Sequence, residues 1–107
     1  MWKIEYHPEA RRELKELDGS QRKVVLKAII KVSENPLPYT EGGYGKPLGN
    51  KSGNNLTGLL KIKLKASGLR IVYKLERNEP ENSMKIVVIS VREDNEVYGI
   101  AAKREGR

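Results

Sequence analysis

Hydrophobic and polar residues alternate near the start of the chain and through much of its second half. At residues 2–6 every second side chain is hydrophobic, which indicates a short edge strand or first strand. The alternation returns at residues 60–65 and 69–75. Residues 85–91 are hydrophobic on both faces, as in a central strand. The pattern therefore predicts four strands, three of which follow one another.

Three other segments repeat their hydrophobic positions with a helical period. Residues 8–17 and 20–34 each carry a hydrophobic face, and the short turn between them predicts a helical hairpin. Asp18 with Gln21 three residues later approximates a capping box at the start of the second helix. A last helix is predicted at 94–103, where an acidic start and a basic end suit the helix dipole.

Turn-forming residues separate these elements. Residues 36–57 hold half of the ten glycines and three of the five prolines, which predicts a long loop. Residues 76–83 are polar and acidic and are predicted as a second loop. The order β-α-α-β-β-β-α indicates an α+β fold. We expect a small antiparallel-type sheet with the N-terminal helical hairpin on one face, a C-terminal helix, and a second face that is partly open and basic. The length of 107 residues predicts one domain, 1–107.

Positive charge is concentrated in the middle of the chain. The net charge is +7, and residues 36–75 contain seven basic side chains but one acidic side chain. Such a localised excess is typical of proteins that bind a polyanion, either a nucleic acid or an acidic protein. Lys61, Lys63 and Lys65 share one face of their strand. Arg70 should join them, because the faces of an antiparallel hairpin match across the pair.

A row of lysines on a strand suits the backbone of single-stranded nucleic acid. Alternate positions lie about 6.6 Å apart, close to the phosphate spacing of an extended strand. Crowding also disfavours the charged form of a lysine within the row, so that such a lysine can act as a general base. RNA supplies its own nucleophile, the 2′-OH. Lys61 or Lys63, Arg70, Arg92 and a tyrosine can then divide base, charge-stabilising and acid roles without a metal.

Composition excludes several other chemistries. The absence of cysteine excludes disulfides and thiolate catalysis, and the single histidine excludes a pair of imidazoles. His7 falls at a strand-to-helix junction and is interpreted as a cap or surface residue. The carboxylates are not clustered, so we expect no metal and no cofactor. The chain has neither a membrane-length hydrophobic segment nor a signal segment, and we expect a cytoplasmic protein that does not bind membranes.

Five segments of the chain resemble the core of RelE-type toxins from bacterial toxin–antitoxin modules. They are GKPL at 45–48, GLLKIKL at 58–64, SGLRIVY at 67–73, ISVR at 89–92 and EVY at 96–98. The resemblance implies a type II toxin that enters the ribosomal A site and cuts the mRNA codon there by 2′-OH attack. It also implies a cognate antitoxin that wraps around the toxin, and operator DNA that is bound only through the antitoxin complex.

The same resemblance assigns roles by position. Lys61 and Lys63 correspond to the catalytic lysines, and Arg70 to the arginine that stabilises the transition state. Arg92 corresponds to a second phosphate-binding arginine, and Tyr98 to the tyrosine that stacks on or orients the cleaved nucleotide. Further RNA-binding residues are expected at Lys46, Lys51, Lys65 and Lys74. One departure is the turn before Arg92, which is shorter than in the best-known members and lacks their extra basic residues.

Each role has a structural alternative. The lysines can form a solvated strand face, Arg70 a surface ion pair, Arg92 a helix-entry surface position, and Tyr98 a packing contact with the sheet. Two other functions also remain open for the chain. A ParE-like DNA gyrase inhibitor would share the fold without cutting RNA, and a non-catalytic RNA-binding regulator would show salt-dependent RNA affinity alone. We further expect an acidic or amphipathic antitoxin segment to cover the basic surface of residues 36–75.

Overall fold

The computed structural model describes residues 1–51, 53–78 and 80–107, without the side chains of residues 50, 51 and 54. These residues form a mixed sheet, three α-helices and one short 3-10 helix. In chain order the elements are β1 (Lys3–Tyr6), α1 (Pro8–Glu16), α2 (Gly19–Ser33), η1 (Tyr39–Glu41), β2 (Lys46–Lys51), β3 (Asn54–Leu64), β4 (Leu69–Asn78), β5 (Glu81–Ser90) and α3 (Asp94–Arg104).

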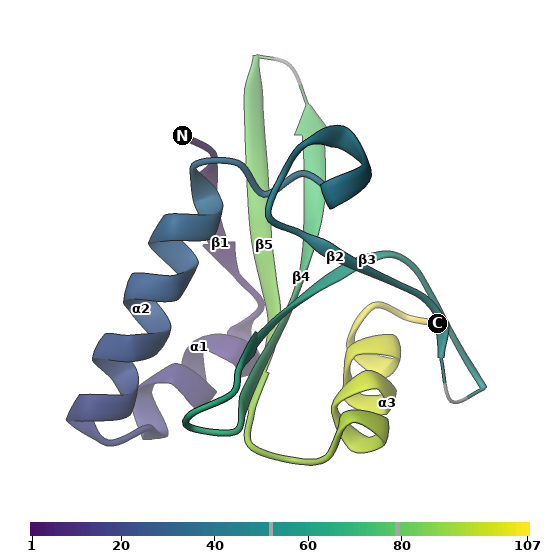
Figure 1. Cartoon of the computed structure of the whole chain (residues 1–107). Coiled ribbons are helices and arrows are strands. Elements are labelled where there is room, and N and C mark those ends of the chain that lie inside the picture. Colours follow the sequence, from purple (N-terminus) through teal and green to yellow (C-terminus); the bar gives the residue numbers. More distant parts are fainter. Residues whose placement is uncertain (52, 79) are drawn as a thin grey trace.

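The sheet has the strand order β1-β5-β4-β3-β2. Strand β1 runs parallel to β5 at one edge, and the other neighbours are antiparallel. Helices α1 and α2 lie on one side of the sheet and α3 on the other (Figure 1). The predicted α+β class and the helical hairpin are therefore confirmed, with one more strand than the sequence pattern indicated.

The additional strand lies in the segment that was predicted as a long loop, and that prediction was wrong. Residues 46–51 form β2, and β3 already begins at residue 54. An edge strand tolerates proline and a local irregularity. Pro47 lies on this edge strand, and the pairing with β3 shifts register between Pro47 and Gly49, where Gly49 has φ +63°. Glycine and proline therefore mark a bulge here and not a loop.

The prediction of a loop at 76–83 was also wrong, because the β4–β5 hairpin continues through most of these residues. β4 extends to Asn78 and β5 begins at Glu81, with Arg77 paired to Asn82 and Asn78 to Glu81. Arg77 and Asn78 are exposed at this end of the sheet. A strand that extends beyond the core has no hydrophobic alternation to reveal it, so only the backbone pairing shows it.

The face of the sheet that was predicted to be partly open is covered by α3. A first hydrophobic core lies between the sheet and the helical hairpin, with Tyr73 and Ile71 fully buried in it. A second core joins α3 to the opposite face and includes Val72, Val97 and Tyr98. The sequence pattern of the last helix was too weakly amphipathic to show that its small residues pack closely against the sheet.

One strand position changes face because of a bulge. Strict alternation predicts that Val87 shares a face with Ile89. The β4–β5 pairing shifts register where Val72 faces Val88 and Tyr73 faces Ile86, so that Val87 is the extra residue. Val87 and Val88 both join the core beneath α3. A bulge adds one residue to one strand and reverses the alternation beyond it.

Local contacts at the helix ends agree with the predicted caps. His7 Nδ1 accepts a hydrogen bond from the Glu9 backbone N–H at 3.1 Å, and Asp18 Oδ1 accepts one from the Gln21 N–H at 2.8 Å. Arg22 closes the hairpin, because its guanidinium donates to carbonyls at the end of α1. The acceptors are Leu14 at 3.2 Å, Lys15 at 2.8 Å and Leu17 at 2.7 Å.

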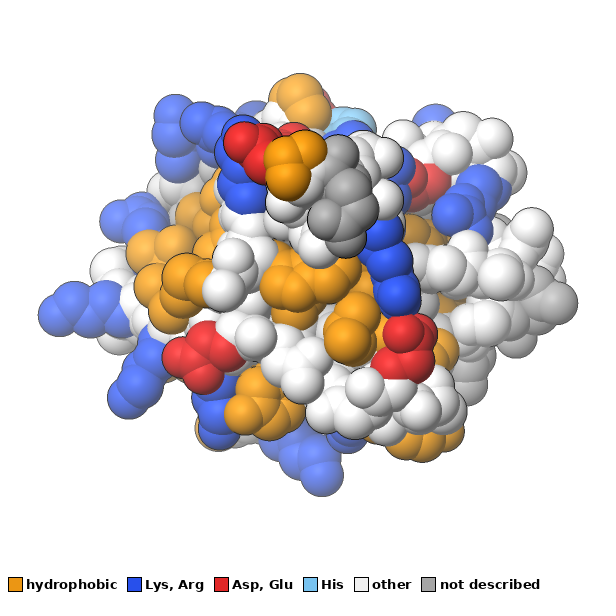
Figure 2. Space-filling view, turned by 90° about the horizontal axis from the view of Figure 1, so that it is seen from above, with side chains coloured by type: hydrophobic (Ala, Val, Ile, Leu, Met, Phe, Trp, Pro, Cys, Tyr) orange, Lys and Arg blue, Asp and Glu red, His pale blue; other side chains and the backbone are white. Residues whose placement is uncertain are grey.

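Hydrophobic side chains are exposed at the end of the molecule that carries η1 and the tip of the β4–β5 hairpin. Seen from above, they occupy much of the centre of this face, and basic side chains lie mainly toward its edge (Figure 2). Tyr39 and Tyr44, in the segment between α2 and β2, are 66% and 52% exposed. The β3–β4 turn and the start of α3 lie at the opposite end of the sheet (Figure 1).

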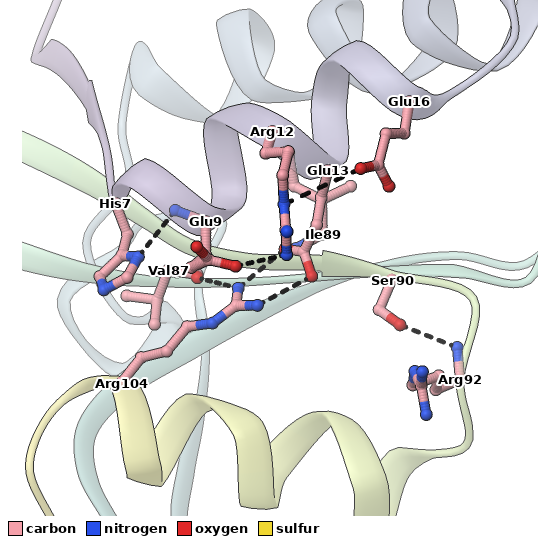
Figure 3. A network of polar contacts seen from close by, with 10 residues as sticks. All are labelled: His7, Glu9, Arg12, Glu13, Glu16, Val87, Ile89, Ser90, Arg92 and Arg104. Carbon is pink, nitrogen blue, oxygen red and sulfur yellow. Dashed lines mark hydrogen bonds and ion pairs between the residues drawn. The ribbon is translucent and has the colours of Figure 1, made fainter.

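A largely buried ion pair connects α3 to α1 where β1 no longer covers β5. The β1–β5 pairing ends at Ile86. Beyond it, Arg104 Nη1 donates to the Val87 carbonyl at 2.9 Å, and Glu13 Oε1 accepts from the Ile89 N–H at 3.1 Å. Glu13 and Arg104 pair with each other at 2.8 and 3.0 Å (Figure 3). The two side chains thus satisfy an open strand edge and fix the end of α3.

Glu13→Gln should destabilise the fold. Arg104 is 13% exposed, so the substitution leaves a largely buried cation without its counter-charge. We expect the free energy of unfolding to fall by about 2 kcal/mol in urea denaturation at neutral pH. Glu16→Gln is the control on the same helix, because its carboxylate is 68% exposed beside Arg12 and should change stability by less than about 0.5 kcal/mol. Equal effects of the two substitutions would contradict the structural role of the Glu13–Arg104 pair.

Candidate functional site

The strand register gathers basic side chains on the face of the sheet beneath the start of α3. Lys63 pairs with Arg70 across β3 and β4, and Lys61 pairs with Lys46 across β3 and β2. Directly opposed residues of antiparallel strands project from the same face. The prediction that Arg70 joins the lysines is therefore confirmed, and Lys46 belongs to the same group.

Asp94, the first residue of α3, lies among these cations. One of its carboxylate oxygens accepts a hydrogen bond from Arg70 Nε, and the other lies 3.7 Å from Lys63 Nζ. Arg70 Nη1 also donates to the carbonyls of Gly68 at 3.1 Å and Arg92 at 2.8 Å. The guanidinium is consequently fixed between the β3–β4 turn and the entry to α3, with its side chain 16% exposed.

Asp94 was missed by the sequence analysis. The acidic start of the last helix was interpreted only as complementing the helix dipole. Residues Asp94 and Arg70 are far apart in the chain, and no local pattern indicates that they meet.

The cations around Asp94 keep its carboxyl group ionised. Partial burial raises the pKa of Asp94, but the hydrogen bond from Arg70 and the charges of Arg70, Lys63 and Lys61 outweigh this effect. The net result is a pKa below the ordinary value of 3.8. The site therefore contains an ionised carboxylate among several positive charges at neutral pH.

Tyr98 lies beneath α3 with its ring packed against the sheet. It is 4% exposed, and Lys61 Nζ donates to its hydroxyl at 3.4 Å. The ring of Tyr98 thus packs against the sheet in this structure, as the structural alternative predicted. Its hydroxyl contacts Lys61, one of the two candidate catalytic lysines. Stacking of a base on this ring would need α3 to move, but orientation through the hydroxyl would not.

Arg92 approaches the cluster with its backbone only. Its carbonyl accepts from Arg70, whereas its guanidinium pairs with Glu96 at 2.8 Å and is 63% exposed. This contact is an ion pair between residues four apart at the start of α3, as expected for a helix-entry surface residue.

The remaining predicted RNA-binding residues have different surroundings. Lys74 pairs with Glu105 at 2.8 Å beneath the end of α3, with the two side chains 27% and 7% exposed. In this structure the Lys74 ammonium group is therefore bound to Glu105 at the end of α3. Lys46 and Lys65 are exposed at the surface. The side chain of Lys51 lies outside the described residues.

Residues 1–51, 53–78 and 80–107 contain no group of three or more His, Cys, Asp or Glu side chains that could bind a metal ion. In the same ranges, no helix has both the length and the hydrophobicity that crossing a bilayer requires.

Comparison with known proteins relates the chain to one group of solved structures. No protein-family model and no curated protein matches it. The isolated E. coli RelE toxin superimposes with a TM-score of 0.66 at 24% identity, covering 98% of this chain and 99% of that chain. The chain has the fold of the RelE toxins. A RelE variant with two arginines replaced by alanine gives a TM-score of 0.66 at 25% identity and 96% coverage of both chains.

The RelE fold is also matched in a complex. In the intact E. coli RelBE toxin–antitoxin complex, the matched chain has a TM-score of 0.64 at 22% identity, and the match covers 87% of this chain and 99% of that chain. The resemblance stated from the sequence is therefore confirmed in the fold over nearly the whole chain.

The ion pairs of Asp94 predict an acid-dependent contribution to stability. A pKa lowered in the folded state means that the carboxylate stabilises the fold above its unfolded value of 3.8, and that this stabilisation is lost as the pH falls through the folded value. Asp94→Asn should therefore lower the free energy of unfolding by about 1 kcal/mol at neutral pH. The difference from wild type should shrink in acid. Urea denaturation of both proteins at several pH values measures it, and a pH-independent difference would contradict the assignment.

Proposed function

We propose that the protein is the toxin of a type II toxin–antitoxin pair and acts as a ribosome-dependent endoribonuclease. The observation that supports this most directly is the cluster of Lys61, Lys63, Arg70 and the Tyr98 hydroxyl at one end of a RelE fold. These residue types can cut RNA by 2′-OH attack without a metal or cofactor. The expected place of action is the cytoplasm, where mRNA is translated.

The surroundings of the two lysines suggest how the roles divide. Lys63 and Arg70 face one shared anion position, at present occupied by Asp94, and would there bind the two non-bridging oxygens of a phosphate. Lys61 lies beside the Tyr98 hydroxyl and would serve in proton transfer. In the proposed reaction, the base removes the 2′ proton and the 2′ oxygen attacks phosphorus. The 5′ oxygen then leaves with a proton, and a 2′,3′-cyclic phosphate remains.

Arg70 supplies the charge that this transition state needs most. Negative charge grows on the phosphoryl oxygens as the 2′ oxygen attacks, and a fixed cation stabilises it without rearranging. Arg70 is suited to this role because the carbonyls of Gly68 and Arg92 hold its guanidinium independently of any substrate. A preorganised guanidinium can also bind a phosphate through two parallel hydrogen bonds.

A cognate antitoxin is the partner that the fold suggests. Two of the matched structures contain E. coli RelE with its antitoxin RelB or with a RelB peptide. By analogy we expect a separate antitoxin chain with acidic side chains for the basic surface of residues 36–75. Complementary charge would speed the encounter and restrict the choice of partner.

Arg70→Ala should abolish mRNA cleavage. We expect a loss of at least about a hundredfold in the rate of cutting at in-frame A-site codons, because the variant lacks the preorganised cation. Primer extension on a defined mRNA in a translating extract measures this. Arg77→Ala is the matched control, since Arg77 lies on the same strand and pairs with Glu41 at 3.0 Å away from the cluster.

Two results would contradict this proposal. An Arg70→Ala protein that cuts mRNA as fast as wild type would remove Arg70 from the mechanism. Intact mRNA with folded wild-type protein would refute the nuclease function, and DNA supercoiling would then test the gyrase alternative. Circular dichroism of each variant shows whether it is folded.

Tyr98→Phe removes the hydroxyl of Tyr98 and keeps its aromatic ring. The ring keeps its packing beneath α3, while Lys61 loses the hydroxyl at 3.4 Å. We expect a single-turnover cleavage rate reduced by about tenfold to a hundredfold with little change in thermal stability. Tyr73→Phe is the control, because its hydroxyl donates to the Pro36 carbonyl at 2.9 Å in the other core. That variant should lose stability and keep its cleavage rate, and the reverse pattern would contradict the role of Tyr98.

A further inference from the structure

The carboxylate of Asp94 is bound as a phosphate group would be. Its two oxygens contact two different cations, one the Nε of Arg70 and the other the Nζ of Lys63 at 3.7 Å. A phosphodiester also presents two charged oxygens from one centre, and arginine and lysine are the side chains that bind them. The same two cations cannot serve both anions fully at once.

We propose that Asp94 is an internal competitor of the substrate, which occupies the phosphate position between Arg70 and Lys63 in the free protein. This inference rests on the proposed function and deepens it. The RelE resemblance assigns no role to Asp94. The proposal gives this residue an effect on RNA binding that is opposite to the effect of the cations around it. Asp94 lowers the affinity of the free protein for RNA, and RNA binds fully only when the carboxylate leaves.

The structure allows Asp94 to leave without unfolding α3. Its side chain is 38% exposed and belongs to the first residue of the helix, so we expect rotation about its own side-chain bonds to carry the carboxylate toward solvent. In the rotated position the carboxylate stays near the helix N-terminus, where the dipole favours negative charge. Arg70 meanwhile keeps its contacts with the carbonyls of Gly68 and Arg92. The cation therefore remains in place for the incoming phosphate.

Such competition favours substrates that arrive at high local concentration. Because the Asp94 carboxylate is always beside the two cations, it competes at high effective concentration with any phosphate group that arrives from solution. An RNA strand that is already held next to the site can displace it. The free toxin would thus bind unselected RNA weakly while keeping its reaction with RNA presented by another assembly.

Asp94→Asn tests the proposal by direct binding. The ligand is a single-stranded RNA oligonucleotide with 2′-deoxy sugars at the cleavage positions, and fluorescence anisotropy at constant low salt measures the dissociation constant. We expect the variant to bind about tenfold more tightly than wild type, because the charged competitor is removed. Glu93→Gln is the matched control. It makes the same change in net charge one residue away, and no ion pair joins Glu93 to the cluster among the described residues.

The control decides how the result is interpreted. Binding by Asp94→Asn that is no tighter than by Glu93→Gln would overturn the proposal, and weaker binding would show that Asp94 positions Arg70 for the substrate. If Asp94→Asn does not fold, the Arg70 Nε–H resonance of the wild-type protein gives the same answer. That resonance should shift when the oligonucleotide is added, and an unchanged resonance under saturating RNA would overturn the proposal.

The binding assay does not depend on catalysis, so the two hypotheses can fail separately. Tighter binding by Asp94→Asn together with intact mRNA in the translating extract would refute the nuclease function and keep the competitor role. Cleavage by wild type together with unchanged binding by Asp94→Asn would keep the nuclease function and refute the competitor role.

Discussion

The docking of α3 on the sheet is the contact on which the candidate site depends. Its small hydrophobic residues form the second core with Val72 and its neighbours, and polar contacts lie at both ends of the helix. At the C-terminal end, Arg104 and Glu13 join α3 to α1 and to the open edge of β5. At the N-terminal end, Asp94 meets Arg70. Because Tyr98 lies between these ends, its hydroxyl reaches Lys61 only while the helix is docked.

Charge in this protein is balanced locally, even though the chain as a whole is strongly basic. The cluster that would bind a phosphate contains a carboxylate, and Lys74 on the same face is paired with the largely buried Glu105. An opposite charge offsets part of the cost of desolvating a buried or half-buried cation. The total of 21 lysines and arginines therefore overstates how many cations are available to a polyanion.

The likeness to RelE lies in the fold more than in the amino-acid sequence. The solved structures agree over almost the entire chain at 22–25% identity, while no family model matches. A fold can persist at such identity because it needs hydrophobic faces, turns and caps, which many residues supply. Chemistry depends on particular side chains. Lys63 and Arg70 meet across β3 and β4, and Asp94 reaches both of them from α3.

The sequence by itself determined the elements whose signals are local. The helical hairpin, its caps at His7 and Asp18, and the shared face of Lys61 and Lys63 follow from periodicity and from side chains a few residues apart. Only the tertiary structure decided what meets across the sheet. Strand β2, the bulge at Val87 and the approach of Asp94 to Arg70 depend on contacts between distant segments. Such contacts form because burial and charge pairing bring those segments together, and no short window of residues records them.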